Sequence, residues 1–245
     1  MDLEGKVALV TGGSRGIGSA IAERLAADGA DIVLTYNTAA GPADEVVARI
    51  RDTGRRALAV PAPATDPEAV PAAVERTVTE FGRLDIVVNN AGIFPYGTID
   101  ELTMEQFDET MNLHVRAAFA AARAASPHLG AGGRIISIGS NLAERATRPG
   151  LSLYSMSKAA LIGFTKGLAR DLGPRGITVN VVQPGSTDTE MNPADSAPAD
   201  AQRAATALGR YAAATEIAAA VAYLAGEGGA FVTGSTLTVD GGANA

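Results

Sequence analysis

A short apolar run, a glycine-rich turn and a helical pattern at the start of the chain constrain the fold more than any other stretch. The apolar run covers residues 6–11, the turn reads Gly-Gly-Ser-Arg-Gly-Ile-Gly from Gly12 to Gly18, and the helical pattern covers 19–28. Such runs are typical of strands that are buried on both faces of a parallel sheet. In this arrangement the glycines permit a tight turn, and the helix N-terminus favours a phosphate group. The spacing is G-x-x-x-G-x-G instead of G-x-G-x-x-G, so a purely structural turn remains an alternative.

The same alternation of apolar runs and helical patterns continues to the end of the chain. We predict further strands at 31–36, 56–60, 84–89, 133–140, 176–183 and 235–239. We predict helices at 43–53, 67–81, 104–125, 151–172, 201–211 and 216–224, with Asp66, Thr103 and Thr215 as N-caps. About seven strands that alternate with helices, without a linker or a repeat, indicate one α/β domain over residues 1–245. Its sheet is expected to be parallel and doubly wound, with helices on both faces.

One long irregular segment interrupts this alternation. It covers 186–200, is rich in Pro, Ala, Ser and Asp, and leads into the predicted helix at 201–211. Long loops inside compact domains are usually lids or binding loops. We therefore expect residues 186–211 to act as a lid over a substrate site.

Charge and composition exclude several classes of function. The 245 residues carry a net charge of -7, which argues against a nucleic-acid-binding role because that role needs a basic face. The chain has no cysteine and only two histidines, His114 and His128, so no metal site is expected. We find no signal-peptide pattern and no apolar run of membrane-spanning length, so no membrane partner and a cytoplasmic location are expected.

The end of the second predicted strand bears on which dinucleotide the turn would hold. In dinucleotide-binding folds an acid near this point binds the ribose 2′-hydroxyl, and it would repel a 2′-phosphate. Here the strand ends as Tyr36, Asn37 and Thr38, with no acid. Together with Arg15 in the glycine turn, this favours NADP over NAD. The alternative interpretation of Arg15 is a solvated surface charge.

A tyrosine and a lysine lie four residues apart at the start of the helix predicted for 151–172. On a helix this spacing places Tyr154 and Lys158 on one face. A positive charge beside a phenol lowers its pKa from about 10, which allows acid–base chemistry closer to neutral pH. An ordinary exposed pair on a surface helix is the alternative, since the pattern alone is common.

Polar and small residues at other strand ends add to this candidate site. Ser140 ends the fifth strand, and Asn90, Ala91 and Gly92 follow the fourth strand, where parallel sheets form ligand crevices. A polar turn is the alternative for the second group. Asn112 stands in the middle of a predicted helix, where asparagine is not favoured, although a solvent-facing position would also tolerate it.

Together these motifs resemble the short-chain dehydrogenases/reductases. The matching stretches are TGGSRGIG at 11–18, NNAG at 89–92, Asn112, Ser140, YSMSK at 154–158 and PG at 184–185. Their order and spacing match over nearly the whole chain, and the sequence is most similar to 3-oxoacyl-[acyl-carrier-protein] reductases. The resemblance implies a Rossmann fold and an enzyme that transfers a hydride between NADP(H) and a carbonyl or alcohol substrate, with a 3-oxoacyl thioester as one candidate. It also implies a homotetramer that pairs through helices 104–125 and 151–172 and through the last helix and strand.

The resemblance also implies a role for each matching residue. Tyr154 would exchange a proton with the carbonyl oxygen, Ser140 would orient that oxygen, Lys158 would lower the tyrosine pKa and bind the nicotinamide ribose, and Asn112 would hold a water in the proton relay. The implied cofactor-binding residues, beside Tyr154 and Lys158, are Gly12, Ser14, Arg15, Ile17, Gly18, Asn37, Thr38, Asn90, Ala91, Gly92, Pro184, Gly185, Thr187 and Thr189.

Three departures from the family pattern qualify these expectations. Pro63 stands where the family usually has an aspartate that contacts the adenine, and Thr187 replaces a usual aliphatic residue. The carrier-protein reductases use basic residues near the active-site mouth, for which this chain offers only Arg175 and His128. The net charge of -7 also disfavours an acidic carrier protein.

Two other functions remain open from the sequence. One is a nucleotide-binding regulator that keeps the fold without turnover; loss of Tyr154 or Lys158 would favour it, and both are present. The other is an NAD-dependent sugar or steroid alcohol dehydrogenase, which an acid at position 36 or 37 would have favoured.

Overall fold

A single parallel sheet forms the centre of the molecule. The computed structural model describes residues 3–63 and 66–245. Seven parallel strands follow the order β3-β2-β1-β4-β5-β6-β9. Their bounds are Val7–Val10 (β1), Asp31–Tyr36 (β2), Ala57–Pro61 (β3), Ile86–Asn89 (β4), Arg134–Ile138 (β5), Thr178–Pro184 (β6) and Thr236–Val239 (β9). The predicted fold class, a doubly wound parallel sheet of about seven strands, is confirmed.

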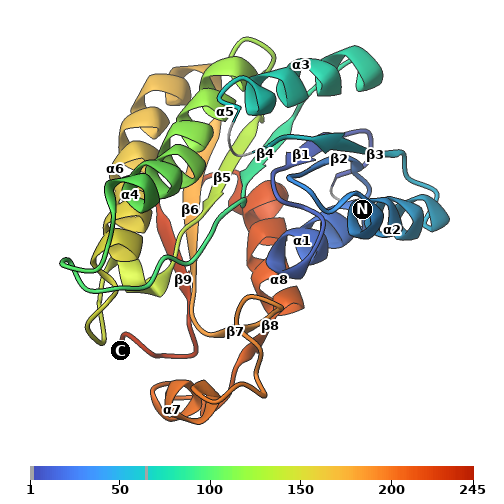
Figure 1. Cartoon of the computed structure of the whole chain (residues 1–245). Coiled ribbons are helices and arrows are strands. Elements are labelled where there is room, and N and C mark those ends of the chain that lie inside the picture. Colours follow the sequence, from blue (N-terminus) through green and yellow to red (C-terminus); the bar gives the residue numbers. More distant parts are fainter. Residues whose placement is uncertain (1–2, 64–65) are drawn as a thin grey trace.

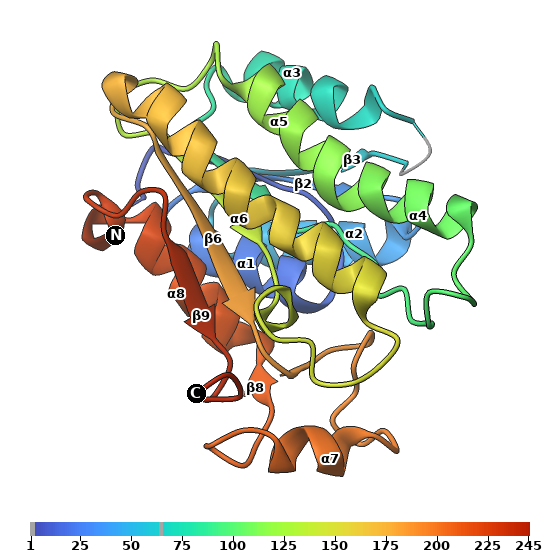
Figure 2. The ribbon, with the colours of Figure 1, turned by 90° about the vertical axis from the view of Figure 1, so that its left-hand side faces the viewer.

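Helices cover both faces of this sheet. Helices α1, α2 and α8 lie on one face, and α3, α4, α5 and α6 lie on the other (Figures 1 and 2). The helices are Gly16–Ala27 (α1), Ala40–Asp52 (α2), Ala69–Phe81 (α3), Met104–Met111 (α4), Ala117–Ala125 (α5), Ser152–Leu172 (α6), Ala199–Ala204 (α7) and Ala214–Ala225 (α8). A π-helical turn, η1, covers Asn112–Arg116, and 3₁₀ turns cover Asn141–Ala143 (η2), Gly173–Arg175 (η3) and Glu227–Gly229 (η4).

The apolar strands of the sequence are explained by these two layers. Side chains of a strand alternate between the two faces of a sheet. In β1, Ala8 and Val10 pack with α1, α2 and α8, whereas Leu9 packs with α3, α5 and α6. All three are fully buried. A strand covered on both faces therefore needs an unbroken apolar run, and this is the pattern that the sequence contains.

The strand order reverses between β1 and β4, and this point positions the candidate site. The chain winds outward through β2 and β3 on one side, then returns to β4 beside β1 and winds outward on the other side. In such sheets ligands bind where the order reverses, at the carboxyl ends of the strands. The glycine turn after β1 and the loop after β4 meet at this edge.

Several helix boundaries differ from the sequence prediction. Helix α1 begins at Gly16 and not at position 19. The predicted helix 104–125 is interrupted by the π-turn η1. The caps expected at Asp66 and Thr215 are wrong: a turn follows Asp66 before α3 begins at Ala69, and α8 begins at Ala214. Asp66 instead accepts a hydrogen bond from the amide of Glu68 within that turn.

The segment 186–211 leaves the sheet at the end of β6 and forms a small substructure of its own. Strand β7, Thr187–Asp188, pairs with strand β8, Ala212–Ala213, and α7 lies between them. These elements lie beyond the carboxyl ends of the strands (Figures 1 and 2). The predicted helix at 201–211 is shorter than expected and occurs earlier. Two-residue strands have no periodicity that a sequence could reveal.

Among the residues that the structure describes, no helix is long and apolar enough to cross a membrane.

Thr103 is confirmed as the N-cap of α4. Its side chain accepts a hydrogen bond from the amide of Gln106, and the Gln106 side chain accepts one from the amide of Thr103. Replacing Thr103 by Ala is expected to lower the free energy of unfolding by about 1 kcal/mol, because a helix amide loses its acceptor. Urea unfolding measures this loss.

Thr79→Ala is the control, because Thr79 is an exposed residue inside α3 whose hydroxyl donates only to the carbonyl of Glu75. It should change the stability by less than about 0.5 kcal/mol. Equal losses in the two variants would contradict the assignment of the cap.

Candidate active site

Close packing against the neighbouring loop explains the glycines of the turn after β1. Gly12 has a positive φ of 64°, and a Cβ there would lie 2.9 Å from the Cα of Ala91. A Cβ at Gly18 would overlap the carbonyl oxygen of Gly12 and approach the side-chain amide of Asn90. The turn therefore lies directly on the loop that follows β4. It leaves the N-terminus of α1, with its free amides, at the open edge of the sheet.

Hydrogen bonds join the same two loops. The Thr11 hydroxyl accepts bonds from the amides of Asn90 and Ala91, at 2.9 and 3.1 Å. The side-chain amide of Asn90 donates to the carbonyl oxygens of Thr11 and Gly12, at 2.9 and 3.0 Å. The Asn90 side chain is thus used to hold the glycine turn in place. Its expected contact with a ribose would have to come from its backbone.

Tyr154, Ser140 and Lys158 come together from two elements. Ser140 follows β5 and caps η2, where its hydroxyl accepts a bond from the amide of Leu142. Tyr154 and Lys158 lie one turn apart on α6, and the Lys158 ammonium lies 5.9 Å from the centre of the tyrosine ring. The ammonium donates to the carbonyl oxygen of Ile138 at 3.0 Å. Lys158 is buried, so the alternative of an exposed surface pair is wrong.

Burial dominates the titration of these groups. Burial raises the pKa of the Tyr154 phenol, and a hydrogen bond with Ser140 opposes this rise. Burial also lowers the pKa of Lys158 to about 8. Burial and the Ser140 hydrogen bond are the influences on the phenol that this structure shows, so the expected lowering of the Tyr154 pKa by Lys158 stays a prediction. Removing the phenolate from water costs more than the hydrogen bond with Ser140 returns.

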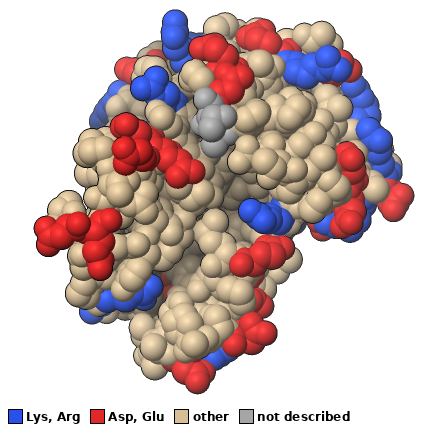
Figure 3. Space-filling model, viewed as in Figure 1, with Lys and Arg blue, Asp and Glu red and all other residues tan. Residues whose placement is uncertain are grey.

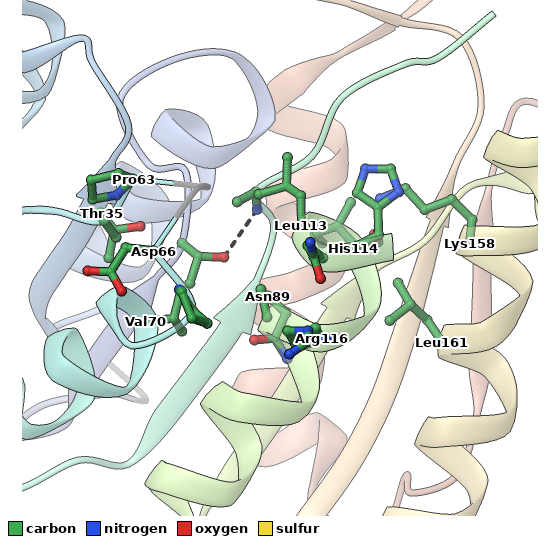
Figure 4. A pocket seen from close by; sticks show the side chains of 18 residues that line it. Thr35, Pro63, Asp66, Val70, Asn89, Leu113, His114, Arg116, Lys158 and Leu161 are labelled. Carbon is green, nitrogen blue, oxygen red and sulfur yellow. Dashed lines mark hydrogen bonds between the residues drawn. The ribbon is translucent and has the colours of Figure 1, made fainter. Parts of the chain in front are cut away.

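A cavity of about 220 Å³ extends from Lys158 to Thr35, Pro63 and Asp66. Asn112, at the start of η1, is one of its lining residues. Lys158 and Asn89 line it as well (Figure 4). Within the described residues, the buried side-chain oxygen of Asn89 has no hydrogen-bond partner. Such an atom is expected to face a polar ligand or a water. The π-turn thus brings Asn112 to the same cavity as Lys158, a common placement for π-bulges at functional sites.

The end of the cavity where the family resemblance would place the adenosine differs from the family pattern. Pro63 and Asp66 line the far end of the cavity, beside Thr35 (Figure 4). The sequence prediction gave Asp66 only a capping role, and its position at this cavity was missed. Arg15, Asn37 and Thr38 are exposed near the ends of β1 and β2, with no acid among them. Ile17 turns its side chain toward the core, so any contact with a cofactor would come from its backbone.

The residues expected at the nicotinamide end lie after β6. Gly185 packs against Asp240, where a Cβ would lie 2.7 Å from the aspartate Cα. Thr187 is buried, and its hydroxyl donates to the carbonyl oxygen of Gly185 at 3.0 Å. This bond explains how a threonine is tolerated at the position of the usual aliphatic residue. Thr189 reaches back to Gly16 at the start of α1 and so links this segment to the glycine turn.

Several residues near the mouth of the site were not singled out from the sequence. The ring of Phe94 lies 4.7 Å from that of Tyr154. The amide of Gly97 donates to the carbonyl of Gly150, which ties two loops together. The C-terminal Asn244 donates to the carbonyl of Asn141, next to Ser140. The space-filling view shows a hollow between these loops and the segment that carries α7 (Figure 3).

This arrangement has the parts that a dinucleotide-dependent redox reaction needs. The close-packed glycine turn and the amides of α1 fit a pyrophosphate, and the absence of an acid after β2 fits a 2′-phosphate. A bound nicotinamide supplies the hydride, and the protein supplies placement and proton transfer.

Comparisons with known proteins identify the family. A family model described as Enoyl-(Acyl carrier protein) reductase matches residues 12–244. A short chain dehydrogenase from Burkholderia cenocepacia J2315, solved in complex with NADP, is 60% identical, with a TM-score of 0.99 over 100% of both chains. The chain belongs to the short-chain dehydrogenase/reductase family. It is an NADP(H)-dependent oxidoreductase.

The names of two relatives in this family point to different functions. The cyclic-di-GMP-binding biofilm dispersal mediator protein of Escherichia coli (strain K12) is 42% identical over 97% of this chain and 96% of its own length. The hydroxynaphthalene reductase-like protein Arp2 of Metarhizium guizhouense (strain ARSEF 977) is 41% identical over 98% of this chain and 95% of its own length. Family membership therefore leaves the substrate open.

Lys158 gives a prediction about stability. At pH 7 Lys158 is protonated in the folded protein, and this charge lowers the free energy of unfolding. The reason is that its pKa of about 8 lies below the 10.5 of a solvated lysine. This loss of stability disappears as the pH rises from about 8 to about 10.5, since the amine is then neutral in both the folded and the unfolded state. Lys158→Met is expected to raise the free energy of unfolding at pH 7 by about 3 kcal/mol, and by less at pH 9.5.

Urea unfolding at the two pH values measures this difference. Lys166→Met changes an exposed lysine of the same helix and is expected to have little effect at either pH. A Lys158→Met variant less stable than the wild type at both pH values would contradict the assignment of a destabilising buried charge.

Proposed function

We propose that the chain reduces a carbonyl compound with NADPH and that Tyr154 is the general acid. Tyr154 would donate its phenolic proton to the carbonyl oxygen while the carbonyl carbon receives the hydride of the cofactor. Ser140 would hold the same oxygen by a hydrogen bond, and Asn112 would hold a water that returns a proton by way of Lys158. The observation that carries the proposal is the meeting of Tyr154, Ser140 and buried Lys158 at the edge that holds the glycine turn.

The direction of the Tyr154 pKa shift supports reduction over oxidation. A phenol whose pKa is raised by burial stays protonated at neutral pH and is ready to donate. Alcohol oxidation needs the phenolate, which burial disfavours. The reverse reaction is therefore expected to require alkaline pH.

The cofactor-binding roles follow from the same placement. The glycine turn, from Gly12 to Gly18, would hold the pyrophosphate, and Arg15 with Asn37 and Thr38 would face the 2′-phosphate. The loop Asn90, Ala91 and Gly92 would pass along the ribose, and Lys158 would bind its hydroxyls. Pro184, Gly185, Thr187 and Thr189 would enclose the nicotinamide. The position of the Thr189 side chain, whose Cγ2 would lie 3.3 Å from a Cβ at Gly16, supports one continuous binding surface.

Two substrate classes are supported by different observations. The resemblance to 3-oxoacyl-[acyl-carrier-protein] reductases supports a 3-oxoacyl thioester. The aromatic ring of Phe94 against Tyr154, with exposed Tyr96 and Ile99 on the same loop, supports a planar aromatic ketone. The name of the Metarhizium relative, a hydroxynaphthalene reductase-like protein, points to the same class.

A panel of ketones distinguishes these classes. We expect NADPH oxidation with an aromatic bicyclic ketone at a kcat/KM at least about tenfold above that with an acetoacetyl thioester, because only a planar ring can stack on Phe94. Absorbance at 340 nm follows the reaction, and a small aliphatic ketone is the reference substrate. A higher kcat/KM for the thioester would favour the acyl reductase function instead.

Removal of the phenolic oxygen of Tyr154 tests whether this residue is the general acid. Tyr154→Phe is expected to lower kcat by at least about a hundredfold, because no proton donor remains beside the carbonyl oxygen, while the Kd for NADPH stays within about threefold. Tyr223→Phe is the matched control, since Tyr223 is exposed on α8, away from the site. A Tyr154→Phe variant with the wild-type rate would rule out the proton-donor role.

A nucleotide-binding regulatory role beside the oxidoreductase activity is the second candidate. The name of the 42% identical Escherichia coli relative, a cyclic-di-GMP-binding protein, favours it. Its test is a fluorescence titration in which cyclic-di-GMP competes with bound NADPH. Displacement of NADPH by cyclic-di-GMP would support the regulatory role, and unchanged NADPH binding would exclude it. An NAD-dependent sugar or steroid dehydrogenase is not supported, because Tyr36, Asn37 and Thr38 include no acid.

The remaining proposals concern organisation. We propose that residues 1–245 work as one domain, with 186–211 as a lid over the substrate. The exposed apolar residues Met104, Phe119 and Met156 on α4 to α6, and Tyr223 and Phe231 near the C-terminus, support a homotetramer that pairs through these surfaces. A cytoplasmic location would place the enzyme with the cellular NADPH pool, and the lack of cysteine is compatible with it.

A further inference from the structure

A buried histidine connects the loop after β4 with the helix that carries Tyr154. His114 lies in η1, two residues after Asn112, and only 3% of its surface is exposed. Its ring faces the edge of the Tyr154 ring, with 6.0 Å between the centres. It lies beside the Lys158 side chain (Figure 4). Neither the proton transfer nor the cofactor contacts described above use this side chain.

Both ring nitrogens of His114 are hydrogen-bonded. Nε2 accepts a bond from the amide of Ile93 at 3.0 Å. Nδ1 lies 2.8 Å from the hydroxyl of Ser157, and that hydroxyl donates to the carbonyl oxygen of Tyr154 at 2.8 Å. A backbone amide can only donate, so Nε2 carries no proton. Because the Ser157 proton is used on Tyr154, Nδ1 must donate to Ser157.

The hydrogen bonds therefore all point in one direction, and His114 has a single tautomer with its proton on Nδ1. The bonds run from Ile93 through His114 and Ser157 to the backbone of Tyr154. A protonated imidazole would place a second hydrogen between Nε2 and the Ile93 amide, which breaks the first bond. Burial and the charge of Lys158 lower the pKa of His114 to about 2, so the neutral ring persists throughout the working pH range.

Packing around Gly92 shows how closely the two parts are held. A Cβ at Gly92 would lie 3.0 Å from Nε2 of His114 and 3.5 Å from the Lys158 ammonium. The loop expected to follow the ribose is thus pressed against His114 on one side and Lys158 on the other. Any shift of the imidazole would move this loop relative to α6.

We propose that His114 is a positioning residue that clamps the loop Asn90 to Ile93 against helix α6 through a permanently neutral Nδ1–H imidazole. His114 touches neither the substrate nor the reacting atoms. It sets the distance between the loop Asn90 to Ile93 and Tyr154. This inference rests on the proposed carbonyl reductase function for its kinetic consequences, whereas the tautomer follows from the bonds alone.

The first test is nuclear magnetic resonance of the wild-type protein with ¹⁵N-labelled histidine. Only two histidines are present, and His128, which pairs with Glu75 and is partly exposed, is the internal control. We expect His114 to show a protonated Nδ1 and an unprotonated Nε2, without change from pH 5 to pH 9. Titration of His114 near pH 6.5, or a protonated Nε2, would overturn the proposal regardless of any activity.

Two substitutions of His114 each remove one of its two hydrogen bonds and keep the other. The side-chain oxygen of His114→Gln can reach the position of Nε2 and accept from Ile93, whereas the side-chain nitrogen of His114→Asn can take the place of Nδ1 and donate to Ser157. We expect His114→Gln to lower kcat by about tenfold with little change in the Kd for NADPH. We expect His114→Asn to raise that Kd by about tenfold, with kcat at saturating NADPH within about threefold. His128→Gln and His128→Asn are the matched controls.

A double-mutant cycle tests the link to α6. Ser157→Ala should reproduce the effect of His114→Gln, and the double variant should be no slower than either single variant, because both remove the same bond. The clamp would be overturned if the double variant lost kcat by the product of the two single losses. It would also be overturned if both His114 variants lost kcat and NADPH affinity to the same extent. If Tyr154→Phe retained activity while the tautomer was as expected, the proposed function would fail and the hydrogen-bonded clamp would stand.

Discussion

The contact between the glycine turn after β1 and the loop after β4 is the constraint on which the candidate site depends. Gly12 and Gly18 allow the two backbones to touch, and Thr11 and Asn90 close the contact with hydrogen bonds in both directions. This contact lies at the point where the strand order reverses, so it fixes the start of α1 beside the loop from Asn90 to Ile93. Any ligand bound at that helix N-terminus is held in register with the residues on α6.

Burial, more than direct charge pairing, sets the chemistry around Tyr154. Lys158 and His114 are buried beside the half-buried Tyr154, and each of the three groups is shifted toward its neutral form. A neutral phenol is a proton donor, and a neutral imidazole can bridge a donor and an acceptor. The cost of placing a lysine there is a loss of stability at neutral pH. Functional sites commonly contain such unfavourable groups, which the rest of the fold must offset.

The sequence predicted most of the fold and the location of the site, and the reasons are physical. Strands buried on both faces need unbroken apolar runs, so all seven could be placed, and the glycines and Tyr154 with Lys158 have spacings that allow few arrangements. The π-turn at Asn112 and the two-residue strands β7 and β8 have no such pattern. The rise of the Tyr154 pKa through burial could not be predicted, because a spacing reveals a neighbouring charge but not how deeply both groups are buried. His114 escaped notice because a single histidine in a helix gives no sign of what its ring contacts.

The account as a whole requires that hydride leave NADPH and arrive at a carbonyl carbon held beside Tyr154. The most direct measurement is the reaction of a ketone that the protein turns over with NADPH carrying two deuterium atoms at C4 of the nicotinamide, followed by mass spectrometry of the product. The account predicts an alcohol with one deuterium on the former carbonyl carbon. An alcohol without deuterium, or NADPH that binds and is consumed by no carbonyl compound, would contradict it.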